Sequence, residues 1–318
     1  MVGVNAEVLR ANLPGACRES PPTQSEHLIQ CLSEVRGVPE QYLAASSGSS
    51  SIMFTVLPRL LDSRSRVLIL DPTYGEYKHL LKNVIGCTID HLPVGIPPEP
   101  ASSVLSQLRK RTSSYSMVIL VNPNSPTGTY LELVDYAKDM ASAAPNTIVW
   151  VDETYLEYLG EGKSLEQHAC AESGNKNLLV CKSMSKCYAL SGLRVAYLCG
   201  QRVPELRHWF PPWSVGLPAQ LAATQALRDP DYYARCYKEV HANRERLLES
   251  LRSRGFYVID GCANFFVLIF PEIASSIVDL CKAEGVYLRS IPKLASLQVA
   301  KLLLLSRNIV HTLLWNFG

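Results

Sequence analysis

Short, nearly continuous apolar runs alternate with longer amphipathic stretches between residues 67 and 198. The apolar runs lie at Val67–Leu70, Met117–Val121, Thr147–Val151, Leu178–Cys181 and Val195–Leu198. Runs without polar alternation are typical of strands that are buried on both faces of a parallel sheet. Between them, Tyr77–Val84 and Leu131–Ser142 have helical spacing. The pattern predicts an α/β fold in which helices cover both sides of a mainly parallel sheet.

The pattern changes after residue 227. Pro230–Ser253 predicts one long polar helix, and charged residues are interleaved through its middle. A helix between two short strands is predicted next, with the elements at Phe265–Phe270, Ile273–Glu284 and Val286–Arg289. We therefore expect a large domain over residues 1–227 and a smaller α+β domain over residues 228–318.

Composition narrows the class of protein. The 318 residues are 47% hydrophobic and 19% charged, which is enough to bury a large core. The 31 basic and 29 acidic residues give a net charge of +2, so we expect neither nucleic acid nor a membrane surface as a partner. No apolar run predicts a membrane span or a signal peptide, which favours the cytoplasm. The 10 cysteines form no C-x-x-C pair, so we expect no metal site.

The most informative polar motif follows the strand predicted at Leu178–Cys181. Ser183 and Ser185 precede Lys186, and Arg194 comes after a mostly small or apolar stretch. A lone lysine after a strand is more often a solvated surface charge. Here it lies beyond the carboxyl end of a parallel strand, where α/β sheets bind ligands. Two hydroxyls and a guanidinium beside it suit a phosphate group.

A second motif places Asp152 directly after the strand predicted at Thr147–Val151. A buried carboxylate is costly unless it meets a cation or a donor. One interpretation is that Asp152 caps the following helix, which aspartate does well. The other is that its carboxylate keeps a pyridinium nitrogen protonated.

Three weaker motifs lie near the ends of other strands. Asn124 and Ser125 belong to a stiff proline-containing loop, which by itself is only a turn. Gly48-Ser49-Ser50 is predicted to open a helix, whose N–H groups can approach an anion. Tyr74 offers an aromatic ring for packing or for stacking. Taken together, the motifs suit pyridoxal phosphate, which needs a lysine for its Schiff base, an acid for its ring nitrogen and donors for its phosphate.

The same residues carry a family resemblance. The motifs are S-M-S-K-C-Y-A-L-S-G-L-R-V-A-Y at Ser183–Tyr197, D-E-T-Y at Asp152–Tyr155 and P-T-Y-G-E-Y at Pro72–Tyr77. Through them the chain resembles the fold-type I, class I/II aminotransferases that use pyridoxal 5'-phosphate. It is most similar to the histidinol-phosphate aminotransferase and threonine-phosphate decarboxylase branch. The resemblance implies that fold, that coenzyme and a homodimer.

The resemblance also implies residue roles. Lys186 forms the Schiff base and moves the α-proton, Asp152 pairs with the pyridinium nitrogen, and Tyr155 donates to the ring's phenolic oxygen. Tyr74 stacks on the ring. The remaining cofactor-binding candidates surround the phosphate or the ring oxygen, and they are Gly48, Ser49, Ser50, Asn124, Ser125, Ser183, Ser185 and Arg194.

Three departures from the family pattern bear on the substrate. Ser125 stands where the family has an asparagine that contacts the ring oxygen, and Asn124 is the alternative donor. Gln298 stands where the family has an arginine that binds the substrate α-carboxylate, and a neutral amide cannot form that ion pair. The N-terminus lacks the family's N-P-x-G loop, so we expect a truncation or a fusion.

The predicted activity is transfer of an amino group from an amine or amino acid to a 2-oxo acid. Because Gln298 replaces the carboxylate-binding arginine, the amine is expected to bear a phosphonate or phosphate, as aminoethylphosphonate does. Two alternatives stay open. One is a pyridoxal-phosphate decarboxylase of a phosphorylated amino acid, and the other is a degenerate, non-catalytic domain.

Overall fold

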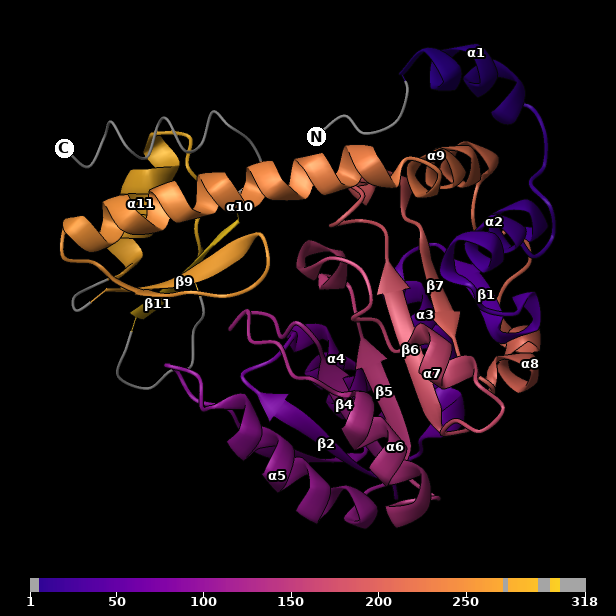
Figure 1. Cartoon of the computed structure of the whole chain (residues 1–318), viewed down its shortest axis with the longest axis horizontal. Coiled ribbons are helices and arrows are strands. Elements are labelled where there is room, and N and C mark those ends of the chain that lie inside the picture. Colours follow the sequence, from indigo (N-terminus) through magenta and orange to yellow (C-terminus); the bar gives the residue numbers. More distant parts are fainter. Residues whose placement is uncertain (1–5, 271–273, 291–297, 304–318) are drawn as a thin grey trace.

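The computed structural model describes residues 6–270, 274–290 and 298–303 and contains two sheets (Figure 1). The larger, seven-stranded sheet has the order β1-β7-β6-β5-β4-β2-β3. Its strands are β1 (Leu43–Ser46), β2 (Arg66–Asp71), β3 (Thr88–Pro93), β4 (Met117–Val121), β5 (Ile148–Asp152), β6 (Leu178–Ser183) and β7 (Ala196–Cys199). The strands from β6 to β3 pair in parallel, and β7 is antiparallel to both β6 and β1. This arrangement confirms the predicted α/β fold and mainly parallel sheet.

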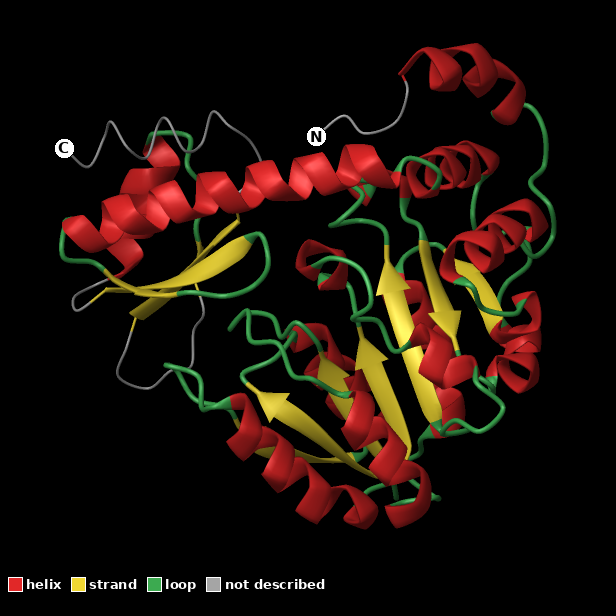
Figure 2. Cartoon of the chain, in the orientation of Figure 1, coloured by secondary structure: helices red, strands yellow, loops and turns green. Residues whose placement is uncertain are grey.

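Helices cover both faces of this sheet (Figure 2). One face packs against α3 (Ser49–Leu60), α4 (Gly75–His79) and the π-helical turn Leu80–Ile85. The other packs against α2 (Glu26–Arg36), α5 (Ala101–Arg111), α6 (Val134–Ala143), α7 (Glu166–Cys170) and α9 (Leu217–Leu227). In β4, Ile119 faces the first core and Leu120 the second. The uninterrupted apolar runs therefore arise because alternate residues enter two separate cores.

The second, four-stranded sheet is antiparallel, with the order β10-β11-β9-β8. Its strands are β8 (Tyr257–Ile259), β9 (Phe265–Phe270), β10 (Arg289–Ser290) and β11 (Gln298–Leu303). The long α10 (Pro230–Ser253) and α11 (Ala274–Ala283) accompany it (Figure 1). The strand expected from residue 286 begins only at Arg289. The domain boundary at residue 227 stays a prediction. It coincides with the end of α9, and α10 begins at Pro230.

Two helices lie at the margins of the larger sheet. The N-terminal α1 (Ala6–Ala16) contacts α9, and the short α8 (Val203–Leu206) follows β7. Among the described residues, no helix is both long enough and apolar enough to cross a bilayer.

Two glycine backbones join the loop after β4 to the loop before β9. Gly128 has φ +71°, and a Cβ there would lie 2.6 Å from Cα of Gly261. Across the same contact, the amide of Cys262 donates to the carbonyl of Gly128 at 3.0 Å. Real side chains do not approach a backbone so closely, so this junction requires glycine.

Candidate active site

The carboxyl ends of β4, β5 and β6 meet at one edge of the larger sheet. Asp152 is the last residue of β5 and pairs with Val121 of β4 and Cys181 of β6. Parallel neighbours bring their following loops to the same side. The loops that begin at Asn122, Glu153 and Met184 are therefore adjacent, as the order of motifs predicts.

Asp152 is 3% exposed, and both of its carboxylate oxygens accept hydrogen bonds. Oδ1 accepts from the amide of Thr154 at 3.0 Å and from its hydroxyl at 2.6 Å, while Oδ2 accepts from the hydroxyl of Tyr77 at 2.9 Å. Burial raises the pKa of Asp152, and these donors only partly oppose that effect. The following turn is a 3₁₀ segment, Leu156–Leu159, so Asp152 closes a local turn and caps no α-helix.

The two chain neighbours of Lys186 are hydrogen-bonded to different parts of the site. Its predecessor Ser185 accepts a hydrogen bond from Nη1 of Arg194 at 3.3 Å. Its successor Cys187 donates to the carbonyl of Thr154 at 3.3 Å, and Thr154 binds Asp152. Lys186 itself is half-buried. These bonds link the two chain neighbours of Lys186 to Arg194 and, through Thr154, to Asp152, and the role of Lys186 itself stays a prediction.

The guanidinium of Arg194 lies against Gly48, at the start of α3. A Cβ on Gly48 would be 2.5 Å from Nη2 of Arg194, and Gly48 has φ +93°. Ser49 begins α3, so the free N–H groups of the first helical turn lie beside this cation. Ser183 accepts from the amide of Ser185 at 3.3 Å and shapes the adjoining turn. A cation, helical N–H groups and hydroxyls together form a cradle for an anion.

Replacing Gly48 with alanine is expected to weaken binding of pyridoxal phosphate by roughly tenfold or more, because the new methyl group displaces the Arg194 guanidinium. The measurement is the dissociation constant of pyridoxal phosphate, followed by absorbance. Gly86→Ala is the matched control, because Gly86 also has a left-handed φ of +78° but a Cβ on it would meet no atom within 4 Å. Equal weakening in both variants would contradict the role of the cradle.

Glu76 is a site-edge residue that the motif analysis did not single out. Its Oε2 accepts from the hydroxyl of Tyr74 at 2.6 Å and from that of Ser50 at 2.8 Å. Ser50 therefore points its proton at a carboxylate in this structure, and its contact with a phosphate stays a prediction. The signal was present in the P-T-Y-G-E-Y motif, where the acid lies between two tyrosines.

The loop that contains Asn124 and Ser125 is held by the Asn124 side chain. Its Oδ1 accepts from Thr73 at 2.8 Å, and its amide donates to the carbonyl of Pro72 at 2.9 Å and to Thr127 at 3.0 Å. These bonds account for both hydrogens of the amide. Contact of Asn124 with a ring oxygen would require breaking one of them, so half-buried Ser125 is the better placed of the two candidates.

Tyr155 is 7% exposed and packs edge-on against Phe265 of β9, with ring centroids 5.0 Å apart. The smaller sheet therefore covers one side of this tyrosine. Gln298, the proposed substitute for the carboxylate-binding arginine, begins β11, and its backbone pairs with Phe270. Its side chain lies outside the described part of the structure, so its role stays a prediction.

A buried ionic cluster lies behind the same strand ends. Nζ of Lys182 is 3.3 Å from Glu153, 2.9 Å from Glu157 and 3.3 Å from Glu166, and Arg36 contacts Glu157 at 3.0 Å. Burial would lower the pKa of Lys182, but the carboxylates outweigh it and raise that pKa well above its ordinary value. Burial raises the pKa of Glu153, whereas Lys182 and Arg36 lower the pKa of Glu157 and Glu166 despite their burial.

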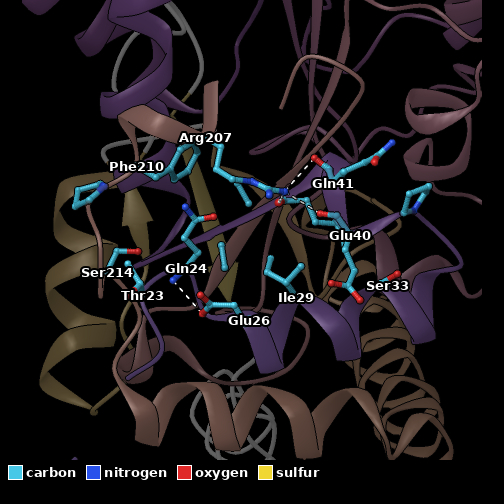
Figure 3. Close-up of a pocket in the computed structure, with 15 residues that line it drawn as sticks. Thr23, Gln24, Glu26, Ile29, Ser33, Glu40, Gln41, Arg207, Phe210 and Ser214 are labelled. Atoms are coloured by element: carbon cyan, nitrogen blue, oxygen red, sulfur yellow. Dashed lines mark hydrogen bonds between the residues drawn. The ribbon is translucent and has the colours of Figure 1, made fainter. Parts of the chain in front are cut away.

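Two cavities are lined by residues other than the cofactor-binding candidates. One of about 590 Å³ is lined by Gln24, Ile29 and Arg207 beside edge strand β1, and Arg207 donates there to the backbone carbonyls of residues 40, 41 and 43 (Figure 3). A second, of about 460 Å³, is lined by members of the ionic cluster, Lys182 among them. No candidate cofactor-binding residue lines either cavity.

Comparisons with known proteins identify the family and the fold. The model of the family described as aminotransferase class I and II matches residues 4–298. A histidinol-phosphate aminotransferase from Microcystis aeruginosa is 28% identical over 258 residues, which are 80% of this chain and 70% of the relative.

Two solved structures have the same fold. The histidinol-phosphate aminotransferase from Sinorhizobium meliloti in complex with pyridoxal-5'-phosphate has a TM-score of 0.81 at 18% identity, and the match covers 98% of this chain and 84% of that one. The L-threonine-O-3-phosphate decarboxylase from Porphyromonas gingivalis has a TM-score of 0.81 at 19% identity, with coverages of 99% and 95%. The shared fold spans almost the entire chain.

Proposed function

Because the chain belongs to the class I and II aminotransferase family, we propose that it transfers the amino group of a phosphate- or phosphonate-bearing amine to a 2-oxo acid. It is a pyridoxal-phosphate-dependent aminotransferase of fold type I. The observation that carries the proposal is the position of Lys186. Its two chain neighbours are hydrogen-bonded, one to Arg194 and the other to Thr154, which in turn binds Asp152.

The residues fit pyridoxal phosphate. Asp152 is a buried carboxylate whose hydrogen-bond donors in the described residues include no cation, and a protonated ring nitrogen would supply a positive charge beside it. The cradle of Arg194, Gly48 and the start of α3 suits the phosphate. The coenzyme, when bound, supplies an aldehyde for the amino group and a ring that withdraws electrons from the substrate α-carbon.

We assign the protein groups as follows. Arg194 and the N–H groups of α3 bind the phosphate, and Asp152 holds a proton on the ring nitrogen. Nζ of Lys186 would take the proton from the substrate α-carbon and hold it for return, so one group would act first as base and then as acid. Tyr155, which is buried against Phe265, would donate its hydroxyl proton to the phenolic oxygen of the coenzyme.

A phosphate- or phosphonate-bearing substrate is supported by two observations. The relatives called histidinol-phosphate aminotransferase and the neighbour called L-threonine-O-3-phosphate decarboxylase act on phosphate esters, as their names state. The sequence also has Gln298 where the family has a carboxylate-binding arginine. Loss of a buried charge-assisted pair costs roughly 2–5 kcal/mol, which disfavours a substrate that depends on its α-carboxylate.

Aminoethylphosphonate is expected to bleach the visible absorbance of the loaded protein faster than glutamate does. The measurement is the rate of this half-reaction under single-turnover conditions, with each amine at matched concentrations. Phosphonate-free ethylamine is the control for the charged group. A large rate advantage for glutamate would contradict the phosphonate part of the proposal and would leave the aminotransferase assignment intact.

The alternative activity is decarboxylation of a phosphorylated amino acid. It is favoured by the neighbour named L-threonine-O-3-phosphate decarboxylase, whose structure covers 99% of this chain. The same residues would serve, because the bond that breaks is the one that stands perpendicular to the ring. Release of carbon dioxide from threonine phosphate without any 2-oxo acid would favour this alternative.

A homodimer is the proposed assembly. Large apolar side chains are exposed near the phosphate cradle, with Phe54 of α3 41% exposed and Leu193, beside Arg194, 37% exposed. Trp209 is 37% exposed, and the guanidinium of Arg59, which is on α3 like Phe54, lies over its ring. Such a surface suits contact with a second copy, and a single-chain mass in analytical ultracentrifugation would contradict it.

A further inference from the structure

We propose that Tyr77 is a positioning residue for Asp152. By one directed hydrogen bond to Oδ2, the oxygen that Thr154 leaves available for the coenzyme nitrogen, it limits how strongly that oxygen attracts the shared proton. The inference rests on the proposed function, since it concerns the same site. Tyr77 belongs to α4, is fully buried, and lies in the P-T-Y-G-E-Y motif, whose earlier tyrosine is the stacking candidate.

Trp150 fixes the direction of the Tyr77 hydrogen bond. Its Nε1 lies 2.9 Å from the hydroxyl oxygen of Tyr77, and an indole N–H can only donate. The hydroxyl oxygen of Tyr77 is therefore an acceptor towards Trp150, and its own proton is directed to Oδ2 of Asp152, 2.9 Å away. The chain Trp150–Tyr77–Asp152 thus has one orientation, with every proton pointing towards the carboxylate.

Counting lone pairs identifies the oxygen that is left for the coenzyme. Each carboxylate oxygen offers about two acceptor sites. Oδ1 of Asp152 accepts both the amide and the hydroxyl of Thr154. Oδ2 accepts only the hydroxyl of Tyr77 among these hydrogen bonds, which leaves it one acceptor site. The ring N–H is therefore expected at Oδ2, where Tyr77 competes directly for electron density.

The charged groups near Tyr77 and Asp152 determine how much this hydrogen bond contributes to stabilising the ionised carboxylate. The carboxylate of Glu76, also on α4, raises the pKa of Asp152, and Cys181 on β6, which has a buried thiol, pairs with Asp152 in the sheet. Burial and the nearby carboxylate raise the pKa of Tyr77 well above its ordinary value, so its hydroxyl stays a neutral donor. No cation is among the residues that bond to Asp152 in the described structure, so hydrogen bonds alone stabilise its charged form.

Removal of the hydroxyl therefore has a predictable sign. A donor to a carboxylate favours its ionised form, so Tyr77→Phe raises the proton affinity of Asp152. For a hydrogen bond to a charged group, the expected change in the acid dissociation constant is roughly tenfold. The shared proton then moves from the ring nitrogen towards Oδ2, and the ring becomes a weaker electron sink.

The decisive experiment is ¹⁵N NMR of the full chain loaded with pyridoxal phosphate that is ¹⁵N-labelled in the ring. In the wild type we expect the chemical shift of a protonated pyridine, and in Tyr77→Phe a displacement towards that of the neutral ring. A second measurement titrates Asp152 by carboxyl ¹³C NMR without coenzyme, where Tyr77→Phe is expected to change the dissociation constant by roughly tenfold. Asp152→Asn identifies the resonance.

Tyr136→Phe is the matched control. Tyr136 is fully buried on α6 and bonds to Thr112 at 2.7 Å, on the opposite face of the sheet. It is expected to change neither measurement. Trp150→Phe, which lets the Tyr77 hydroxyl rotate, is expected to give a smaller shift of the same sign. It also serves as the test if Tyr77→Phe does not fold.

Two outcomes separate the inference from the function beneath it. Unchanged ¹⁵N and ¹³C readouts in both Tyr77→Phe and Trp150→Phe, in a protein that binds coenzyme normally, would overturn the inference and leave the proposed function standing. A wild-type protein that binds no coenzyme would overturn the proposed function and the coenzyme half of the inference. The ¹³C titration would still decide whether Tyr77 controls Asp152.

Discussion

Lys186→Ala is expected to lower the turnover of amino transfer by roughly 10⁴-fold, because it removes both the nucleophile and the group that moves the α-proton. Lys186 is the residue between Ser185, which binds Arg194, and Cys187, which binds Thr154. The assay measures kcat with aminoethylphosphonate or glutamate and a 2-oxo acid. Borohydride reduction followed by peptide mapping measures the covalent adduct, which the variant is expected to lose.

Lys176→Ala is the control for this experiment. Lys176 is an exposed lysine shortly before β6, so its removal tests whether borohydride traps any accessible amine. It is expected to keep both turnover and the mapped adduct. An adduct that persists in Lys186→Ala, or wild-type protein that carries an adduct but processes no amine, would contradict the catalytic assignment, and the second result would favour a degenerate domain.

Lys182→Met is expected to lower the free energy of unfolding by roughly 3–5 kcal/mol, the range for breaking a buried ion pair. Its Nζ lies within 3.3 Å of three carboxylates, and its side chain is 4% exposed. Removing the ammonium group leaves Arg36 as the one cation that contacts Glu157 and Glu166 in the described structure. Urea denaturation of the protein without coenzyme measures the loss.

Lys163→Met separates burial from the simple loss of a lysine. Lys163 lies 3.4 Å from Glu132, and their side chains are 44% and 55% exposed. Exposed pairs contribute about 1 kcal/mol or less, so this variant is expected to unfold nearly as the wild type does. Lys182→Arg keeps the charge and is expected to recover most of the lost stability. Equal destabilisation by Lys163→Met and Lys182→Met would contradict the account of the cluster.

Hydrophobic pattern alone located much of the fold. The predicted bounds of β4, β9 and α10 coincide with the observed ones. Edge strands β1 and β3 were missed. Most of β3 is only partly buried, so it lacks a continuous apolar run. The antiparallel direction of β7 was also missed, because a run of buried residues reads the same in either direction.

In the candidate site, too, the sequence indicates local features but not contacts between residues that are far apart in the chain. Residues that share a short motif, such as Ser185 and Lys186, can be singled out from the sequence because they are close together along the chain. The bond from Tyr77 to Asp152 joins residues far apart in the sequence, so no local pattern could reveal it. The hydrogen bonds of Asn124 with Pro72 and Thr73 could not be predicted for the same reason.

The contact between Gly128 and Gly261 has a consequence for how this chain can evolve. At an ordinary interface, a larger residue on one side can be accommodated by a smaller one on the other. Here a Cβ on either residue would meet the Cα of the other, at 2.6 or 2.7 Å, and glycine is already the smallest partner available. A substitution at one position therefore cannot be compensated by a smaller residue at the other. Each position is expected to remain glycine independently, and covariation between the two is expected to be absent.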